Sequence, residues 1–177
     1  MTKLRKHFRM LPLALMLVVV CGAAALAQRQ LSVGAQKSAA GRPEVKITLA
    51  GSVEREGQSL TLDKVEAVRP GEVLQWNMLS VNEGEGAARE YKAVGHIPKG
   101  TSFVAGSAVG EGSSTVTYSI DGGKTFSTQP IIEEKQPDGT IKRVPAPVSM
   151  YTEVRYEWTD SLAAGGKVSA SYKVRVK

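Results

Sequence analysis

Strict alternation of apolar and polar residues near the end of the chain limits the possible fold more than any other feature. Between residues 167 and 177 every second residue is apolar, and these residues are Val168, Ala170, Tyr172, Val174 and Val176. Residues 151–158 alternate in the same way, with one face made of Thr152, Val154, Tyr156 and Trp158. A period of two indicates antiparallel β-strands with one buried and one solvated face. Tyr151, Glu153, Arg155 and Glu157 are therefore predicted to point outward.

Shorter strand-like segments fill the region before these two strands. They are separated by turn signals such as Pro70-Gly71 and Pro98-Lys99-Gly100, and they are 45–49, 60–67, 73–81, 91–97, 103–104 and 116–120. A change of phase after Leu62 predicts a β-bulge near Asp63-Lys64. Apolar pairs on either side of Pro137-Asp138-Gly139 predict an additional hairpin near residues 130–145.

No amphipathic helical stripe of ten or more residues occurs after residue 30. The sequence therefore predicts an all-β fold, an immunoglobulin-like antiparallel sandwich of about seven to nine strands. A β-barrel is the alternative architecture. With one Cys in the whole chain, the sandwich is predicted to lack a disulfide.

The first 27 residues have the pattern of a secretory signal peptide. Four basic residues precede an apolar run from Leu11 to Leu26, and the small residues Ala25 and Ala27 mark a cleavage site. The run is short for a membrane-spanning helix, so no membrane span is expected after cleavage. Two alternatives remain open, an uncleaved anchor and lipid attachment at Cys21. Residues 28–43 are rich in Gln, Ala, Ser and Gly, which predicts a flexible linker before a domain at 44–177.

Removal of the signal peptide changes the charge of the chain. Four of the 23 basic residues and none of the 17 acidic ones lie in it, so the net charge falls from +6 to +2. A balance of +2 without a clustered basic face gives no reason to expect a nucleic-acid partner. The pattern predicts an exported protein in the periplasm, on the cell surface or outside the cell.

Four short segments in a fixed order resemble a known family. They are Pro70-Gly71-Glu72-Val73-Leu74-Gln75-Trp76, Val81-Asn82-Glu83-Gly84, Ile97-Pro98-Lys99-Gly100-Thr101-Ser102-Phe103-Val104 and Leu162-Ala163-Ala164-Gly165. Together they make residues 45–177 similar to the bacterial cell-envelope domain of unknown function number eleven. The resemblance implies an immunoglobulin-like module of surface and secreted proteins, and it implies no chemistry. Gly95-His96 replaces an acidic residue common in that family, and the hairpin near 130–145 is an insertion.

One segment resembles the Asp-box turn of sialidase-type propellers. It has the pattern Ser-x-Asp-x-Gly-x-Thr-aromatic, formed here by Ser119, Asp121, Gly123, Thr125 and Phe126. A carboxylate can accept bonds from the amides of such a turn, and glycine can adopt a positive φ. A single box does not make a propeller, so these residues are predicted to form a structural turn.

No set of residues with catalytic, cofactor-binding or metal-binding spacing is found. His96 is the one His after the signal peptide, and no base-orienting partner can be identified for it by spacing. The Asp residues are isolated from one another, and they are Asp63, Asp121, Asp138 and Asp160. Calcium prefers clustered carboxylates, so no metal site and no cofactor are predicted.

Three classes of function remain. The first is a non-enzymatic exported module with a structural or protein-interaction role in the cell envelope. The second is a carbohydrate-binding or adhesion module, which requires exposed aromatic side chains on one face. The third is a hydrolase with a carboxylate-based site. The expected partner is accordingly an envelope protein or a polysaccharide. Outward residues of the last strand, such as Lys167 and Lys173, are a further candidate for contact with an anionic surface.

Overall fold

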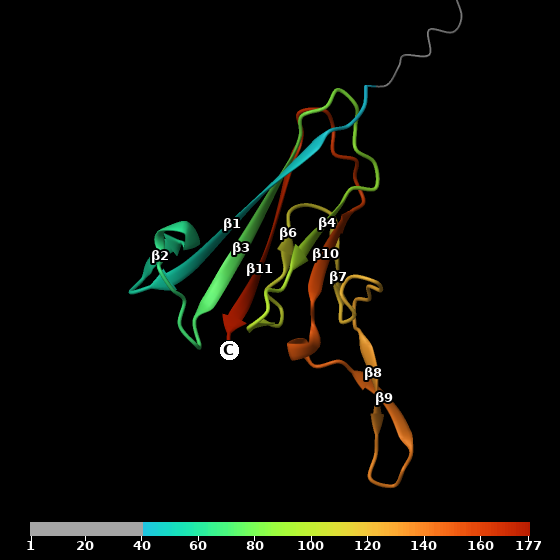
Figure 1. Ribbon diagram of the computed structural model, residues 1–177. Coiled ribbons are helices and arrows are strands. Elements are labelled where there is room, and N and C mark those ends of the chain that lie inside the picture. Colours follow the sequence, from blue (N-terminus) through green and yellow to red (C-terminus); the bar gives the residue numbers. More distant parts are fainter. Residues whose placement is uncertain (1–40) are drawn as a thin grey trace, which may run out of the picture. The chain divides into compact units, whose positions relative to one another are not determined.

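Three long strands lie side by side at the centre of the larger sheet. The computed structural model describes residues 41–177, and in it β1 (Val45–Arg55), β3 (Val73–Asn82) and β11 (Lys167–Val176) are antiparallel neighbours (Figure 1). The sheet order is β2-β1-β3-β11-β5, with β6 also paired to β11. The three short strands are β2 (Gln58–Thr61), β5 (Thr101–Phe103) and β6 (Val109–Gly110).

A second, three-stranded sheet packs against this one. It has the order β4-β10-β7 and contains β4 (Lys92–His96), β10 (Glu153–Trp158) and β7 (Ser114–Ser119). The predicted antiparallel β-sandwich is thus confirmed, and the sheets do not close into a barrel. The described residues form eleven strands, more than the predicted range. Strands of two to four residues, such as β2 and β6, are too short to give a clear alternation signal.

The additional hairpin is present and stands apart from the two sheets. It is formed by β8 (Ile131–Lys135) and β9 (Ile141–Pro145), which pair only with each other. Figure 1 shows it extending away from the end of the smaller sheet. The predicted signal peptide, with its cleavage site at Ala25 and Ala27, lies outside the described residues, as does the predicted linker up to residue 40.

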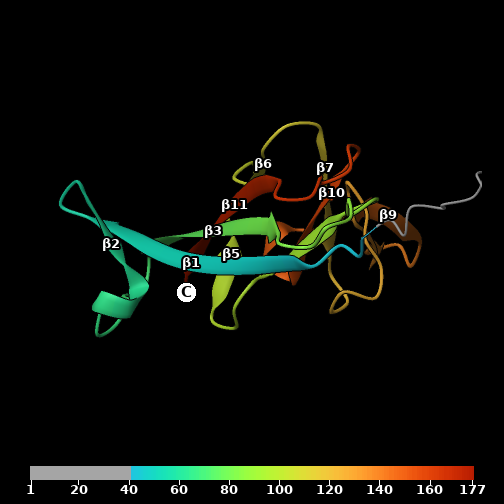
Figure 2. The same cartoon turned by 90° about the horizontal axis from the view of Figure 1, so that it is seen from above.

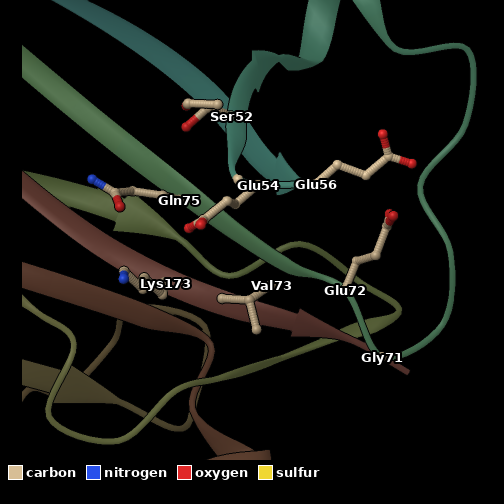
Figure 3. A pocket seen from close by; sticks show the side chains of 10 residues that line it. Ser52, Glu54, Glu56, Gly71, Glu72, Val73, Gln75 and Lys173 are labelled. Atoms are coloured by element: carbon tan, nitrogen blue, oxygen red, sulfur yellow. The ribbon is translucent and has the colours of Figure 1, made fainter.

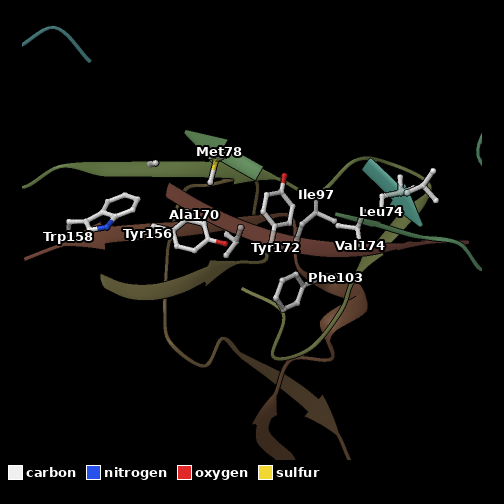
Figure 4. Packing of buried hydrophobic residues seen from close by; sticks show 12 residues of the cluster. Leu74, Met78, Ile97, Phe103, Tyr156, Trp158, Ala170, Tyr172 and Val174 are labelled. Carbon is white, nitrogen blue, oxygen red and sulfur yellow. The ribbon is translucent and has the colours of Figure 1, made fainter. Parts of the chain in front are cut away.

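The core lies between the sheets and is rich in aromatic residues. Its fully buried members include Val154, Tyr156, Tyr172 and Val174, which alternate along β10 and β11 as the period of two predicts (Figure 4). Tyrosine hydroxyls satisfy their hydrogen bonds across the interface between the sheets. Tyr156 donates to the carbonyl of Ser171 at 2.7 Å, and Tyr172 donates to that of His96 at 2.6 Å. Burial raises the pKa of Tyr172 to about 12.

The end of the sandwich where β1 begins is held together by one buried side chain. Asn82 is completely buried, and its amide nitrogen donates to the carbonyls of Gly86, Leu162 and Ala163. Its amide oxygen accepts from the backbone N–H groups of Glu44 and Gly84. Asn82 therefore ties the start of β1 to two loops that are distant in the sequence.

Two local expectations are wrong. No bulge occurs at Asp63-Lys64, because β2 ends at Thr61 and the chain turns into the short 3-10 helix η1 (Leu62–Lys64). Tyr151 does not point outward, because it follows the 3-10 helix η2 (Val148–Met150) and packs on the rings of Phe103 and Tyr118. The strand pattern of residues 151–158 begins only at Glu153, so the period does not extend to Tyr151.

The helical segments of the described residues are very short. Within residues 41–177, no helix has the length and apolar character needed to cross a membrane.

Candidate interaction surface

Strand β1 has an edge that is open over its first seven residues. It pairs with β3 from Val45 to Val53, but β2 pairs with its other side only from Ser52 to Arg55. Within the described part of the chain, no strand pairs with the free side of the segment Val45–Gly51, which we call the open edge of β1. An unpaired edge presents N–H and C=O groups that can pair with another strand.

The alternation of the backbone fixes which residues offer these groups. The loop between β1 and β2 consists of Glu56 and Gly57, both with positive φ, which makes Arg55 and Gln58 a hydrogen-bonded pair. In an antiparallel ladder every second residue turns its polar groups to the same side. Counting back from Arg55, the residues that face the open side are Gly51, Leu49, Ile47 and Val45. In agreement, the carbonyl of Glu44 faces β3 and accepts from Glu83 N–H at 2.7 Å.

Apolar side chains accompany this open edge. Ile47 and Leu49 are 49% and 51% exposed, although they lie on the inner face of the sheet opposite the buried residues Ser80 and Met78. The smaller sheet covers β3 and β11: Tyr91, next to β4, donates to Ser80 Oγ of β3, and Tyr156 of β10 donates to the Ser171 carbonyl of β11. It leaves the beginning of β1 uncovered. Figure 2 shows β1 and β3 side by side along the larger sheet.

The other edges of the two packed sheets are short or protected, and the separate β8-β9 hairpin has edges of five residues each. Strands β2, β5 and β6 have four, three and two residues. The edge of β7 is closed by a bridge in which Tyr118 and Ser127 exchange hydrogen bonds at 2.8 and 3.0 Å. The edge strand β4 has five residues and ends two residues before Pro98. Short strands and prolines are common ways of preventing edge pairing, so the open edge of β1 stands out among the described edges of the two packed sheets.

The Asp-box-like residues form a hydrogen-bonded turn beside the smaller sheet. The carboxylate of Asp121 accepts from the backbone N–H groups of Lys124 and Thr125 and from the hydroxyls of Ser119 and Thr125. These bonds, led by those from Thr125, lower the pKa of Asp121 to about 2. Gly123 adopts a φ of 80° and donates its N–H to Ser119 Oγ. The turn uses its polar groups internally.

The same turn covers part of the outer face of β10, which the sequence predicts to be solvated. Glu153 is 8% exposed, and its carboxylate accepts from the Thr152 hydroxyl. Phe126 lies beneath the Arg155 guanidinium, whose central carbon is 4.0 Å from the ring centre. The outward position of Glu153 is confirmed by its register with His96 and Ser119, but the expectation of a solvated position is wrong.

His96 has a carboxylate partner that sequence spacing does not reveal. Its Nδ1 is 3.3 Å from Glu153 Oε1, and its side chain is 68% exposed. The pair forms because β4 and β10 are neighbours and place the two residues directly opposite each other. Of the isolated Asp residues, Asp121 and Asp138 bond within their own turns, Asp138 through Thr140. Within residues 41–177, no group of three or more His, Cys, Asp and Glu side chains is arranged to hold a metal ion.

An acidic groove of about 570 Å³ lies at the far end of β1. Figure 3 shows the carboxylates of Glu54, Glu56 and Glu72 around it, with Lys173 at one side. Glu72 forms a two-pronged pair with Arg55, with N–O distances of 2.8 and 3.0 Å. This pairing lowers the pKa of Glu72 and commits that carboxylate to a structural contact.

A smaller cavity of about 340 Å³ lies beside the stacked rings of Tyr91 and Trp158. Glu111, Asp160 and Lys167 contribute polar groups to its wall. Trp158 is only 6% exposed and donates its indole N–H to the carbonyl of Glu111, so it offers little ring face to a ligand. A sugar-binding platform requires such a face.

Comparisons with family models, with curated proteins and with solved structures found no match to this chain. The site therefore has to be interpreted from its own geometry. The alternation of Val45, Ile47 and Leu49 predicts an ordinary strand with one apolar face. Only the arrangement of the sheets shows that the face is left uncovered.

Proposed function

We propose that this chain is an exported, non-enzymatic β-sandwich module of the bacterial cell envelope that acts by binding another polypeptide along the open edge of β1. The observation that carries the proposal is one seven-residue segment that combines half-exposed Ile47 and Leu49 with backbone groups that pair with no other strand of residues 41–177. Strand addition to an exposed sheet edge gives affinity through main-chain hydrogen bonds and specificity through alternate side chains.

Two sequence features support the cellular part of the proposal. The signal-peptide pattern of residues 1–27 favours export, and the resemblance to the cell-envelope domain favours a surface or secreted module. A β-sandwich hosts many functions, so the fold alone does not select among them. The open edge supports a protein partner in preference to a polysaccharide, because a sugar has no strand to pair with it.

The test is photo-crosslinking in the cells that make the protein. A photoreactive amino acid is placed at Ile47, and in a matched variant at Leu79, which is 43% exposed on the opposite face of the same sheet. We expect the protein in an exported fraction, with a protein adduct from position 47 that is absent from position 79. A protein retained in the cytoplasm, or equal adducts from both positions, would refute the proposal. Substrate turnover by the purified protein would refute its non-enzymatic part.

A further inference from the structure

The open edge of β1 is limited at both ends by features of the chain. At one end, Ser52 is already paired with Thr61 of β2, and Gly51 is crowded by Leu62, whose Cδ1 would lie 2.5 Å from a Cβ added at that glycine. At the other end Pro43 has no N–H to donate. The stretch that an added strand can follow is therefore Val45–Leu49, and its midpoint is Ile47.

This stretch is complementary to itself. If two copies pair antiparallel about a two-fold axis at Ile47, then Ile47 faces Ile47 of the second copy, and Val45 faces Leu49. These are the residues that direct their N–H and C=O groups to the open side, so each facing pair exchanges two hydrogen bonds. A shift of the register toward β2 would bring the added strand against Thr61. A shift away from it would shorten the ladder.

The side chains also match in this register. Val45, Ile47 and Leu49 of both copies lie on the same inner face, where Ile47 and Leu49 are half exposed in the single chain. Cross-strand apolar pairs of this kind stabilise a sheet. Lys46 is the one charged residue of the stretch, lies on the other face and stands opposite Thr48, so like charges do not oppose each other. Two-fold pairing is also the commonest symmetry of soluble oligomers.

We propose that the polypeptide bound at the open edge is a second copy of this chain, paired through β1 about a two-fold axis at Ile47. This inference rests on the proposed function and names the partner of the same edge. The pairing joins the two larger sheets into one continuous sheet. It also brings together the half-exposed side chains of Ile47 and Leu49 from both copies.

The first test is sedimentation velocity of the purified exported protein over a wide range of concentration. We expect a reversible dimer for the wild type and a monomer for Ile47→Lys at the concentrations where the wild type is dimeric. Leu79→Lys is the matched control, because it places the same charge at a similarly exposed residue on the opposite face. It should leave the dimer intact. A monomeric wild type, or equal disruption by both variants, would overturn the proposal.

The second test reads the register directly, using single cysteines in a Cys21→Ser background. Facing residues in a hydrogen-bonded pair have Cα atoms about 5.5 Å apart, which suits a disulfide. Ile47→Cys should therefore form a covalent dimer under mild oxidation. Leu49→Cys should not, because its two copies would lie about 13 Å apart along the strands. Crosslinking of Leu49→Cys without that of Ile47→Cys would overturn the register.

Failure of this inference can be told apart from failure of the proposed function. A monomeric wild type whose position 47 still crosslinks to a different envelope protein overturns pairing with a second copy and leaves the proposed function in place. A monomeric wild type that gives no position-specific adduct overturns both.

Discussion

Replacement of Asn82 is expected to cost more stability than any conservative change of an exposed residue. Its side chain makes five hydrogen bonds, with lengths from 2.7 to 3.2 Å, to the backbone of three separate segments. Asn82→Ala removes all five hydrogen bonds at once, while the backbone groups that made them remain. The carbonyl of Gly86 loses a fully buried bond and has no other donor among the described residues, whereas the carbonyl of Leu162 still accepts from Ala88 N–H at 2.9 Å. A buried polar group left unpaired costs about 1–3 kcal/mol, so the Gly86 carbonyl alone predicts a loss of about 1–3 kcal/mol.

Asn82→Asp provides a second, independent prediction, which concerns the direction in which stability changes with pH. It replaces the amide nitrogen by a carboxylate oxygen that faces three carbonyl oxygens, which disfavours the charged form and raises the pKa of the introduced carboxyl above its unfolded value of about 3.9. The variant is therefore least destabilised below about pH 4, where the carboxyl is protonated in both states. It loses further stability as the pH rises through the raised folded-state pKa.

The assay is urea unfolding of both variants at pH 7 and near pH 4, with Asn77→Ala and Asn77→Asp as controls. Asn77 lies on the same strand, β3, but its side chain is exposed, so its variants should stay within about 0.5 kcal/mol of the wild type. A loss below about 1 kcal/mol for Asn82→Ala would refute the reasoning. So would an Asn82→Asp variant whose stability relative to the wild type improves as the pH rises.

Three further predictions concern the turn, the core and the hairpin. Asp121→Asn should be destabilised relative to the wild type above about pH 4. This difference in stability should vanish as the pH falls through about 2, the lowered pKa of Asp121. Melting temperatures of the two proteins that run parallel from pH 7 to 2 would contradict this. Gly95→Ala should cost about 1–3 kcal/mol in urea unfolding, because its Cβ would lie 2.4 Å from Tyr172 Cε1, whereas Val94→Ala at the exposed neighbouring position should cost much less. Replacement of residues 131–145 by a short Gly/Ser loop should change Tm by less than about 4 °C. The hairpin adds nothing to the buried core, and its ends meet in a hydrogen bond from Ala146 N–H to the Pro130 carbonyl. A larger loss would show that the hairpin supports the sandwich.

The sequence predicts well those parts of the fold that depend on the local alternation of apolar and polar residues. The faces of β10 and β11 follow directly from alternation, and the core residues Tyr156, Tyr172 and Val174 lie where that alternation places them. The hairpin near residues 130–145 follows from its Asp-Gly turn. These features depend on residues that are close in the sequence, so a single chain contains enough information to place them.

The candidate site depends on how strands distant in the sequence pack together, and the alternation along one strand does not show this. Alternation places Ile47 and Leu49 on one face, but it does not say whether another sheet covers that face. The contact between His96 and Glu153 depends on the register of β4 against β10. The alternation predicts an outward Tyr151, but this residue directly follows η2 and packs inward on Tyr118.

The directions of the three central strands have a mechanical consequence. Strands β1 and β11 both pair antiparallel with β3, so the chain enters the larger sheet at the end near Asn82 and leaves it at the opposite end, near Glu72. Tension applied through Gly41 and Lys177 would run along the strands, and the ladders of β3 would be loaded in shear. Their hydrogen bonds would then share the load and break together, whereas bonds pulled sideways open one after another. A module tethered at both ends would resist stretching through the same backbone pairs that define its fold.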